Sequence, residues 1–339
     1  MSDDKSMIGT NIDFDRDGLQ TGTLRLPHSV HRSAYGHIAI PIAVAKNGEG
    51  PTVLLTGGVH GDEYEGPIAL ARLVRELDLS RLSGRLIVVP AVNYPAFVAG
   101  TRTSPIDDIN LNRTFPGKRN GTATEMIAHY VTTELLPRSD YLVDFHAGGS
   151  SLQYLPTLLA PRWSDPEQKQ RLEEFIDAFD PPNVVYFDSI RALSGEDRVI
   201  GNYAHQNNVF FVTGEFGGGS TVNIEGLAVV ENGLRAVLSH LKVLAPAAPL
   251  PKRRGKVRRL VMDDPGLYAF APRRGFFEPR FALGDEVPAG ALAGLIYDLD
   301  NPWAEPVPVH FRHGGFAVCI RTFSLVEAGD CLGHLASPA

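Results

Sequence analysis

The chain has 339 residues, of which 43% are hydrophobic and 21% are charged. At roughly 100–200 residues per domain, this length predicts two or three domains, and the composition excludes a wholly disordered protein. The net charge is −7 and the pI is about 5.9. These values argue against a nucleic-acid-binding protein, because such proteins need a basic face to neutralise phosphates.

Membrane and secretory segments are not expected. No apolar run approaches the roughly 20 residues that span a bilayer. Residues 1–18 are polar and acidic and lack the apolar stretch of a secretory signal. Cys319 and Cys331 are the only cysteines, too few for a disulfide scaffold or a cysteine-rich zinc module. We therefore expect a cytoplasmic protein that has no membrane or nucleic-acid partner.

Strands and helices are predicted to alternate over residues 1–245. Short apolar runs indicate strands, and apolar residues at 3.6-residue spacing indicate helices. Such alternation favours an α/β fold with a mixed or mostly parallel central sheet flanked by helices. The predicted strands are 38–46, 52–58, 85–92, 141–146, 183–187 and 209–216; the predicted helices are 64–77, 123–136, 166–179 and a last one from the N-cap Asn223 to about 243.

The composition changes after residue 245. Residues 246–256 are rich in proline and basic residues and are predicted to be an interdomain linker. Residues 257–339 contain short apolar pieces separated by Gly, Pro and Asp, which predicts a small all-β domain. Its segments 283–297 and 326–336 share a Gly-Asp pattern that resembles the barrel-sandwich domains carrying biotin or lipoate. Those carriers modify a lysine, and no lysine follows Lys256, so the resemblance indicates a shape and not a carrier function.

Two motifs that follow predicted strands offer metal ligands. His60 and Glu63 stand in GGVHGDEYEG, and His146 ends the segment YLVDFH. Together they form a His₂Glu set, the ligand count of a catalytic zinc site with one open position. Singly, each has a structural alternative: a turn histidine, a glutamate in the first turn of a helix, or a hydrogen-bonded histidine. Asp144 is either a partner of His146 or a plain strand-end carboxylate.

A third strand end supplies a candidate general base. Glu215 follows an apolar strand and precedes three glycines in VFFVTGEFGGG. A carboxylate at this place must face a cavity or find a partner, because burying it unpaired is costly. We expect Glu215 to take a proton from a metal-bound water and deliver it to the leaving amine. The alternative is a glutamate that caps a loop or a helix.

The polar segment 102–117 is expected to be a loop that binds substrate. Arg113 has the planar fork that pairs with a carboxylate, and Asn112 adds a further donor. Arg102 is placed to stabilise an oxyanion that develops on an attacked carbonyl group. The alternative is that these are ordinary surface arginines.

Taken in order, the motifs H-G-D-E, N-L-N-R-x-F-P-G, D-F-H and G-E-F-G-G resemble the succinylglutamate desuccinylase/aspartoacylase family, itself related to zinc carboxypeptidases. The resemblance covers residues 35–245 and the small β domain that follows. It implies that His60, Glu63 and His146 bind zinc, that Glu215 is the base, and that Asn112 and Arg113 hold the substrate carboxylate. Arg102 stands further from the Asn-Arg pair than the family's arginine does. The family's C-terminal domain also contributes a residue that narrows the pocket.

The function predicted from these motifs is zinc-dependent hydrolysis of the amide bond of a small N-acyl amino acid. The segments around GGVHGDEYEGP and DINLNRTFPG are most similar to the N-acetyl-diaminobutyrate deacetylase branch, which acts in ectoine degradation. The alternatives are an N-succinylglutamate or N-acetylaspartate deacylase, a zinc carboxypeptidase acting on peptides, and a non-catalytic binding or carrier protein. The ligand types alone tolerate other divalent metals, and a homo-oligomer stays open.

Overall fold

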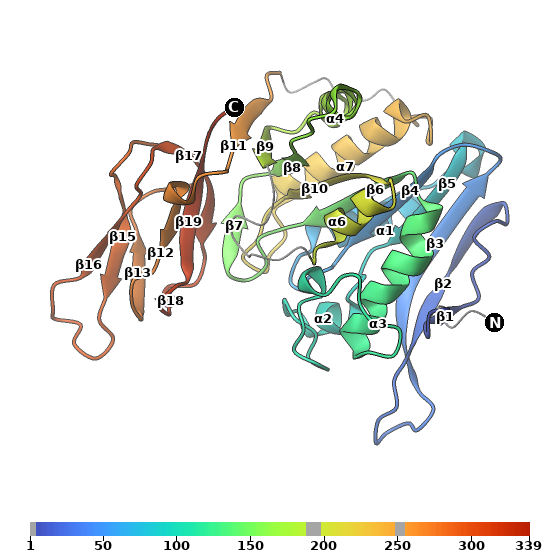
Figure 1. The fold of residues 1–339 in the computed structure, drawn as a ribbon, viewed down its shortest axis with the longest axis horizontal. Coiled ribbons are helices and arrows are strands. Elements are labelled where there is room, and N and C mark those ends of the chain that lie inside the picture. The colour runs from blue at the N-terminus through green and yellow to red at the C-terminus, as the bar shows by residue number, and fades with distance from the viewer. Residues whose placement is uncertain (1–4, 188–197, 248–254) are drawn as a thin grey trace.

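The computed structural model describes residues 5–187, 198–247 and 255–339. In this part of the chain, helices pack on a long sheet, and a smaller β region extends from one end (Figure 1). The strands before residue 245 are β1 Gly9–Thr10, β2 Gly18–Pro27, β3 His37–Asn47, β4 Thr52–Gly57, β5 Gly84–Val89, β6 Tyr141–His146, β7 Leu152–Tyr154, β8 Thr157–Pro161, β9 Asn183–Phe187 and β10 Phe210–Glu215. The helices are α1 Glu65–Arg75, α2 Tyr94–Ala99, α3 Ala123–Tyr130, α4 Pro166–Phe179, α6 Ile200–Gln206 and α7 Ile224–His240.

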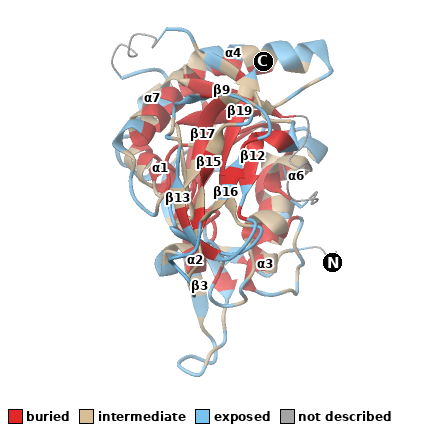
Figure 2. Ribbon diagram, turned by 90° about the vertical axis from the view of Figure 1, so that its left-hand side faces the viewer, coloured by how far each residue is buried: buried red, intermediate tan, exposed pale blue. Residues whose placement is uncertain are grey.

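The centre of the sheet is parallel and covered on both faces. Strands β5, β4, β6 and β10 lie side by side in this order and run parallel to one another. In β4, Val53 and Leu55 pack with α1, α4 and α7, while Leu54 packs with α3 and α6 on the other face. Figure 2 shows buried residues gathered in the interior of the molecule and exposed residues on its outer helices and loops. This arrangement confirms the predicted α/β fold with a mixed sheet.

The β region after the linker continues the same sheet. Its strands are β11 Arg258–Val261, β12 Tyr268–Phe270, β13 Gly275–Pro279, β14 Glu286–Val287, β15 Leu292–Tyr297, β16 Val307–His310, β17 Gly315–Arg321, β18 Leu325–Val326 and β19 Cys331–Pro338. Strand β11 pairs in parallel with β9, and β17 pairs with β7. Strands β16, β15, β13 and β18 form a second sheet. The described residues after 255 hold no helix beyond a 3₁₀ turn at Pro265–Leu267, as the sequence predicts. Residues 248–254 of the expected linker lie outside the described residues.

Most predicted elements agree with the structure, and the differences have local causes. Helix α4 and strand β9 have the predicted bounds, and the Asn223 side chain caps α7 by accepting a hydrogen bond from the Gly226 N–H at 2.8 Å. The predicted strand 85–92 ends at Val89, because Pro90 has no N–H to donate to a ladder. The predicted helix 123–136 is α-helical only to Tyr130 and continues as a π turn over Val131–Leu135. There the Thr132 and Thr133 hydroxyls donate to carbonyls four residues earlier, which loosens the helix.

No helix in the described ranges is long and apolar enough to cross a membrane.

Candidate active site

Three neighbouring parallel strands end at one edge of the sheet, and the predicted metal ligands and Glu215 lie at or just after these ends. His146 is the last residue of β6 and Glu215 the last residue of β10, and the two are directly paired across the ladder. His60 follows β4, which pairs with β6 on its other side. Because the carboxyl ends of parallel strands share an edge, residues far apart in the sequence converge there.

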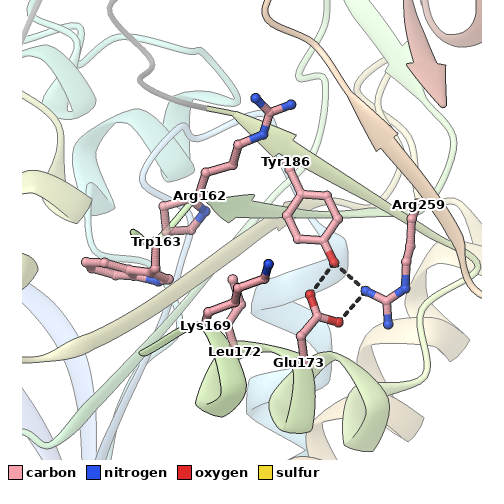
Figure 3. Close-up of a pocket in the computed structure, with 8 residues that line it drawn as sticks. Arg162, Trp163, Lys169, Leu172, Glu173, Tyr186 and Arg259 are labelled. Atoms are coloured by element: carbon pink, nitrogen blue, oxygen red, sulfur yellow. Dashed lines mark hydrogen bonds and ion pairs between the residues drawn. The ribbon is translucent and has the colours of Figure 1, made fainter. Parts of the chain in front are cut away.

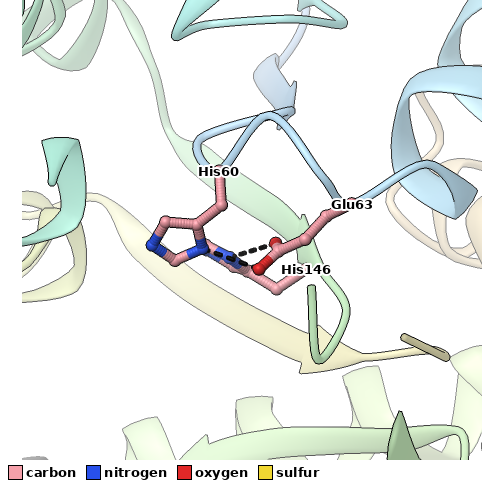
Figure 4. Close-up of side chains that lie close together, drawn as sticks. All are labelled: His60, Glu63 and His146. Carbon is pink, nitrogen blue, oxygen red and sulfur yellow. Dashed lines mark hydrogen bonds and ion pairs between the residues drawn. The ribbon is translucent and has the colours of Figure 1, made fainter. Parts of the chain in front are cut away.

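His60, Glu63 and His146 form a buried cluster (Figure 4). The Nδ1 atom of His60 lies 2.7 Å from one Glu63 carboxylate oxygen, and the Nδ1 atom of His146 lies 2.9 Å from the other. One ligand atom from each residue lies within 4.8 Å of the others. This spacing and donor set suit a metal ion held by two imidazoles and a carboxylate.

The second nitrogen of each imidazole ring has its own partner. The Nε2 atom of His146 lies 2.8 Å from the Asp144 carboxylate, which also accepts a hydrogen bond from the Thr56 hydroxyl at 2.6 Å. The Nε2 atom of His60 lies 3.2 Å from the Asn110 side-chain oxygen. If each Nε2–H group donates a hydrogen bond to its acceptor, each ring keeps its lone pair on Nδ1, the nitrogen that faces Glu63. A nitrogen lone pair in that place is what metal ligation requires. Asp144 is therefore a partner of His146 and not a plain strand-end carboxylate.

Burial and charge shift the acid–base properties of these groups in opposite directions. Burial disfavours the charged form of Glu63, but the adjacent His60 and His146 imidazoles outweigh it and hold the pKa of that carboxyl below its ordinary value. Burial raises the pKa of the Glu215 carboxyl to about 8, and the negative charge of Glu63 adds to the effect. The Oε2 atom of Glu215 is buried and has no hydrogen-bond partner among the described residues. A carboxyl group in this state is suited to carry a proton.

A cavity of about 220 Å³ opens over this cluster. It gathers six of the seven predicted site residues, while Glu63 lies beneath its wall. Its lining combines apolar side chains with polar and charged ones. The predicted residues in its lining are His60, Arg102, Asn112, Arg113, His146 and Glu215, joined by Asp144, Tyr154, Leu159, Phe187, Val199, Ile200, Gly201, Phe211, Thr213 and Met262.

The predicted loop 102–117 contributes three of these residues. Arg102 lies over the cluster, with a guanidinium nitrogen 3.4 Å from the His60 Nδ1 atom and 3.7 Å from a Glu63 oxygen. Asn112 and Arg113 lie in a 3₁₀ turn, where the Asn112 side-chain oxygen accepts from the Ile200 N–H at 3.2 Å. Asn112 also lines the cavity, and its amide nitrogen is the donor end of the side chain.

Among the site residues that the sequence did not predict, three link the site to other parts of the chain. Asn110 accepts from the Asn112 N–H at 2.9 Å and contacts His60, so it ties the substrate loop to the metal cluster. Tyr154 lines the cavity, and its hydroxyl lies 3.1 Å from the Nε2 atom of His334 in β19. Met262, just after β11, is the lining residue from the C-terminal β region. The family resemblance implied a pocket-narrowing residue from this region, and Met262 is a candidate for it.

Glycines at two points allow the loops to close on the site. A Cβ atom at Gly61, between His60 and Glu63, would lie 2.0 Å from the Ala96 carbonyl group of α2. Gly218, after Glu215, has a φ of +144°, and a Cβ there would lie 2.0 Å from the Leu152 carbonyl oxygen. Larger residues at either position would displace the catalytic loops.

A second cavity, of about 350 Å³, lies beside α4 and holds none of the predicted residues. Figure 3 shows Arg162, Trp163, Lys169, Leu172, Glu173, Tyr186 and Arg259 around it. The Glu173 carboxylate accepts from the Tyr186 hydroxyl at 2.6 Å and pairs with Arg259 at 2.5 Å. The Glu173 carboxylate of this cavity is therefore already paired within the protein. We take the cavity over the His–Glu–His cluster as the active site.

Residues 49–241 match the model of the succinylglutamate desuccinylase/aspartoacylase catalytic domain. The chain belongs to this family. It is therefore an enzyme of a deacylase family.

Relatives match over nearly the whole chain. An N-alpha-acetyl-L-2,4-diaminobutyric acid deacetylase of Halomonas elongata is 38% identical over 98% of this chain and 95% of its own. The product-bound ectoine utilization protein EutE (DoeB) of Ruegeria pomeroyi is 39% identical, with a TM-score of 0.91 over 98% of this chain and 99% of that one. A succinylglutamate desuccinylase/aspartoacylase of Rhodobacter sphaeroides is 36% identical, with a TM-score of 0.90 over 98% and 100%.

Proposed function

We propose that this enzyme hydrolyses the amide of Nα-acetyl-L-2,4-diaminobutyrate to acetate and L-2,4-diaminobutyrate, using zinc. The observation that carries the proposal is one small cavity that joins the His–Glu–His cluster, the unpartnered oxygen of Glu215 and two arginines. The choice of substrate rests on the relatives from Halomonas elongata and Ruegeria pomeroyi, which match over 98% of the chain.

The cluster fits zinc in its donor types. His60 and His146 offer imidazole nitrogens, Glu63 offers carboxylate oxygens, and three protein ligands leave one position open. Asp144 and Asn110 orient the two rings from behind. When bound, zinc supplies a Lewis acid and lowers the pKa of a water toward about 7.

Glu215 moves the proton in this mechanism. Its Oε2 atom accepts a proton from the attacking water as the new C–O bond forms at the acyl carbon. It then donates that proton to the amide nitrogen as the C–N bond breaks. Arg102, which lies over the cluster, donates to the acyl oxygen where negative charge develops.

Arg113 and Asn112 hold the substrate in place. The Arg113 guanidinium pairs with the α-carboxylate, and the Asn112 amide nitrogen donates a further hydrogen bond. Leu159, Phe187, Phe211 and Met262 bound the cavity with apolar surface. A space of about 220 Å³ admits a small acyl amino acid and argues against a long peptide.

Two further expectations stay proposals. We propose that residues 1–245 and 257–339 are separate domains joined by the linker 246–256. We also propose a cytoplasmic location, since Cys319 and Cys331 are both free thiols.

The test is a product assay on zinc-loaded protein with a chelator control. The panel contains N-acetyl-2,4-diaminobutyrate, N-succinylglutamate, N-acetylaspartate and a blocked dipeptide. We expect chelator-sensitive release of acetate from the first substrate. Cleavage of a different acyl amino acid would move the enzyme to another branch of the family. Cleavage of the dipeptide alone would make it a peptidase and overturn the proposal.

A further inference from the structure

Two buried carboxylates beside the metal cluster have no part in the proposed mechanism. Asp62 stands between the proposed ligands His60 and Glu63, and Glu65 is the first residue of α1. The exposed fractions of Asp62 and Glu65 are 1% and 0%, and neither side chain lines the active-site cavity. Burying a carboxylate is costly, and such groups gather at functional sites. Both side chains are therefore candidates for a role in this site.

The Asp62 carboxylate joins the loop that carries two proposed ligands to the loop that follows the third, His146. Its Oδ2 atom accepts a hydrogen bond from the Ser150 N–H at 2.6 Å. A Cβ atom at Gly149 would lie 2.7 Å from the same oxygen, so the carboxylate packs directly on the backbone of this second loop. Asp62 thus connects two segments that must stay close together for the cluster to bind a metal.

The Glu65 carboxylate makes the same kind of contact with the loop after Glu215. Its Oε1 atom accepts a hydrogen bond from the Asn223 N–H at 2.8 Å. A Cβ atom at Gly217 would lie 2.2 Å from this oxygen. Because the loop of residues 216–223 begins directly after Glu215, this contact fixes the loop of the proposed base against the first turn of α1.

Backbone hydrogen bonds join the second and third loops to each other. The Gly148 N–H donates to the Gly217 carbonyl at 3.0 Å, and the Ser220 N–H donates to the Gly149 carbonyl at 2.9 Å. The other oxygen of each carboxylate, Oδ1 of Asp62 and Oε2 of Glu65, is buried and has no hydrogen-bond partner among the described residues. The contacts that the two acids make with the neighbouring loops are therefore made at an energetic cost.

We propose that Asp62 and Glu65 are positioning residues that hold the three catalytic loops at their working separation. The inference rests on the proposed function, in which the His–Glu–His cluster binds zinc and Glu215 moves the proton. Asp62 holds the two ligands of its own loop against the third, so it controls the affinity for the metal. Glu65 holds the loop after Glu215, so it controls where the base stands relative to the cluster, and thereby kcat.

The first experiment measures zinc affinity by competition with a chelator in Asp62→Ala and Asp62→Asn. Alanine removes the acceptor of the Ser150 N–H, and zinc affinity should fall by about 10–100-fold. Asparagine keeps an acceptor oxygen and should recover most of this loss. Asp140→Ala is the matched control and should leave zinc affinity unchanged. The Asp140 carboxylate accepts from the Thr52 N–H at 2.7 Å and joins β6 to β4 at the ends of these strands opposite the site.

The second experiment separates the two carboxylates. Glu65→Ala should keep native zinc affinity, while kcat on N-acetyl-2,4-diaminobutyrate falls by roughly 10²-fold at an unchanged KM. Glu65→Gln keeps an acceptor for the Asn223 N–H and should recover most of the loss in kcat. A purely structural role would lower the melting temperature of the alanine variant and leave kcat and zinc affinity native.

Amide hydrogen exchange of the full chain tests the contacts independently of metal and activity. Exchange should become faster at residues 147–151 in Asp62→Ala and at residues 216–223 in Glu65→Ala, and at neither in Asp140→Ala. Unchanged exchange in both variants would overturn the inference. So would native zinc affinity in Asp62→Ala or native kcat in Glu65→Ala. A native protein that binds no zinc or releases no acetate would instead overturn the proposed function, and hydrogen exchange would still decide whether the two carboxylates position the loops.

Discussion

Buried polar side chains divide unevenly between the part before residue 245 and the strands after residue 257. The first part buries the carboxylates Asp62, Glu63, Glu65 and Asp144 together with two imidazoles. In the described strands of the second part, the buried polar or charged side chain is His334, which contacts Tyr154 of the first part. One sheet therefore joins a region that keeps charged groups out of water to a region with an almost purely apolar core.

This difference shows where the molecule accepts an energetic cost. A buried carboxylate destabilises a fold unless it is paired or hydrogen-bonded, and such groups gather at functional sites. Glu63 and Asp144 meet this condition through their contacts with His60 and His146, whereas the buried Oε2 atom of Glu215 has no partner among the described residues. The C-terminal strands contribute Met262 as a wall and His334 as a support for Tyr154. They shape the cavity without taking part in the proposed proton transfer.

The largest effect is expected from removing a proposed metal ligand. His146→Ala should lower the zinc content from about one ion per chain to none and abolish turnover, because two ligands remain. Metal analysis and the acetate assay measure the two quantities. His240→Ala, an exposed histidine at the end of α7, is the control. A His146→Ala protein that keeps zinc and activity would place the metal elsewhere.

A smaller effect is expected from changing Asp144, the partner of the proposed metal ligand His146. Asp144→Asn removes the charge next to the His146 Nε2 atom while keeping the shape of the side chain. Zinc affinity should fall by about 10–100-fold, the usual effect of losing such a partner. Competition with a chelator of known affinity measures it. Unchanged affinity would show that Asp144 only stabilises the strand.

A conservative change at the substrate loop separates binding from metal chemistry. Arg113→Lys keeps the charge but loses the planar fork, so kcat/KM should fall by about tenfold, mainly through KM. Zinc content should stay the same. Arg119→Lys, an arginine further along the chain with its own backbone partner, is the control. A fall in kcat alone would argue that Arg113 does not hold the ground-state carboxylate.

The smallest effect is expected from changing Met262, which lines the cavity from the C-terminal β region. Met262→Ala should enlarge the cavity and raise the rate on N-propionyl relative to N-acetyl substrate by about tenfold, the low end for one methylene. Leu325→Ala, on the exposed surface of β18, should leave the ratio unchanged. An unchanged ratio in Met262→Ala would mean that the wall does not limit the acyl group.

The sequence predicts the parts of the site that depend on local order. His146 and Glu215 end apolar strands, and the α/β pattern places such ends together before any contact is known. Asn110, Tyr154 and Met262 reach the site through long-range contacts. Tyr154 depends on the pairing of β7 with β17, Met262 follows a strand that pairs with β9, and Asn110 depends on a turn that returns to His60.

Strand β2 was not predicted from the sequence, because two buried leucines, Leu24 and Leu26, are too few to establish an alternating pattern. Its pairing with β3 decides its structure. The domain division at residues 246–256 stays a prediction.

Glu215→Gln is the most direct test of the proposed chemistry, because it keeps the size of the side chain and removes the group that moves the proton. We expect a protein with native zinc content whose turnover of N-acetyl-2,4-diaminobutyrate is about 10²–10⁴-fold slower. Glu173→Gln, in the second cavity, should remain fully active. Near-native turnover in Glu215→Gln would contradict general-base catalysis at this site.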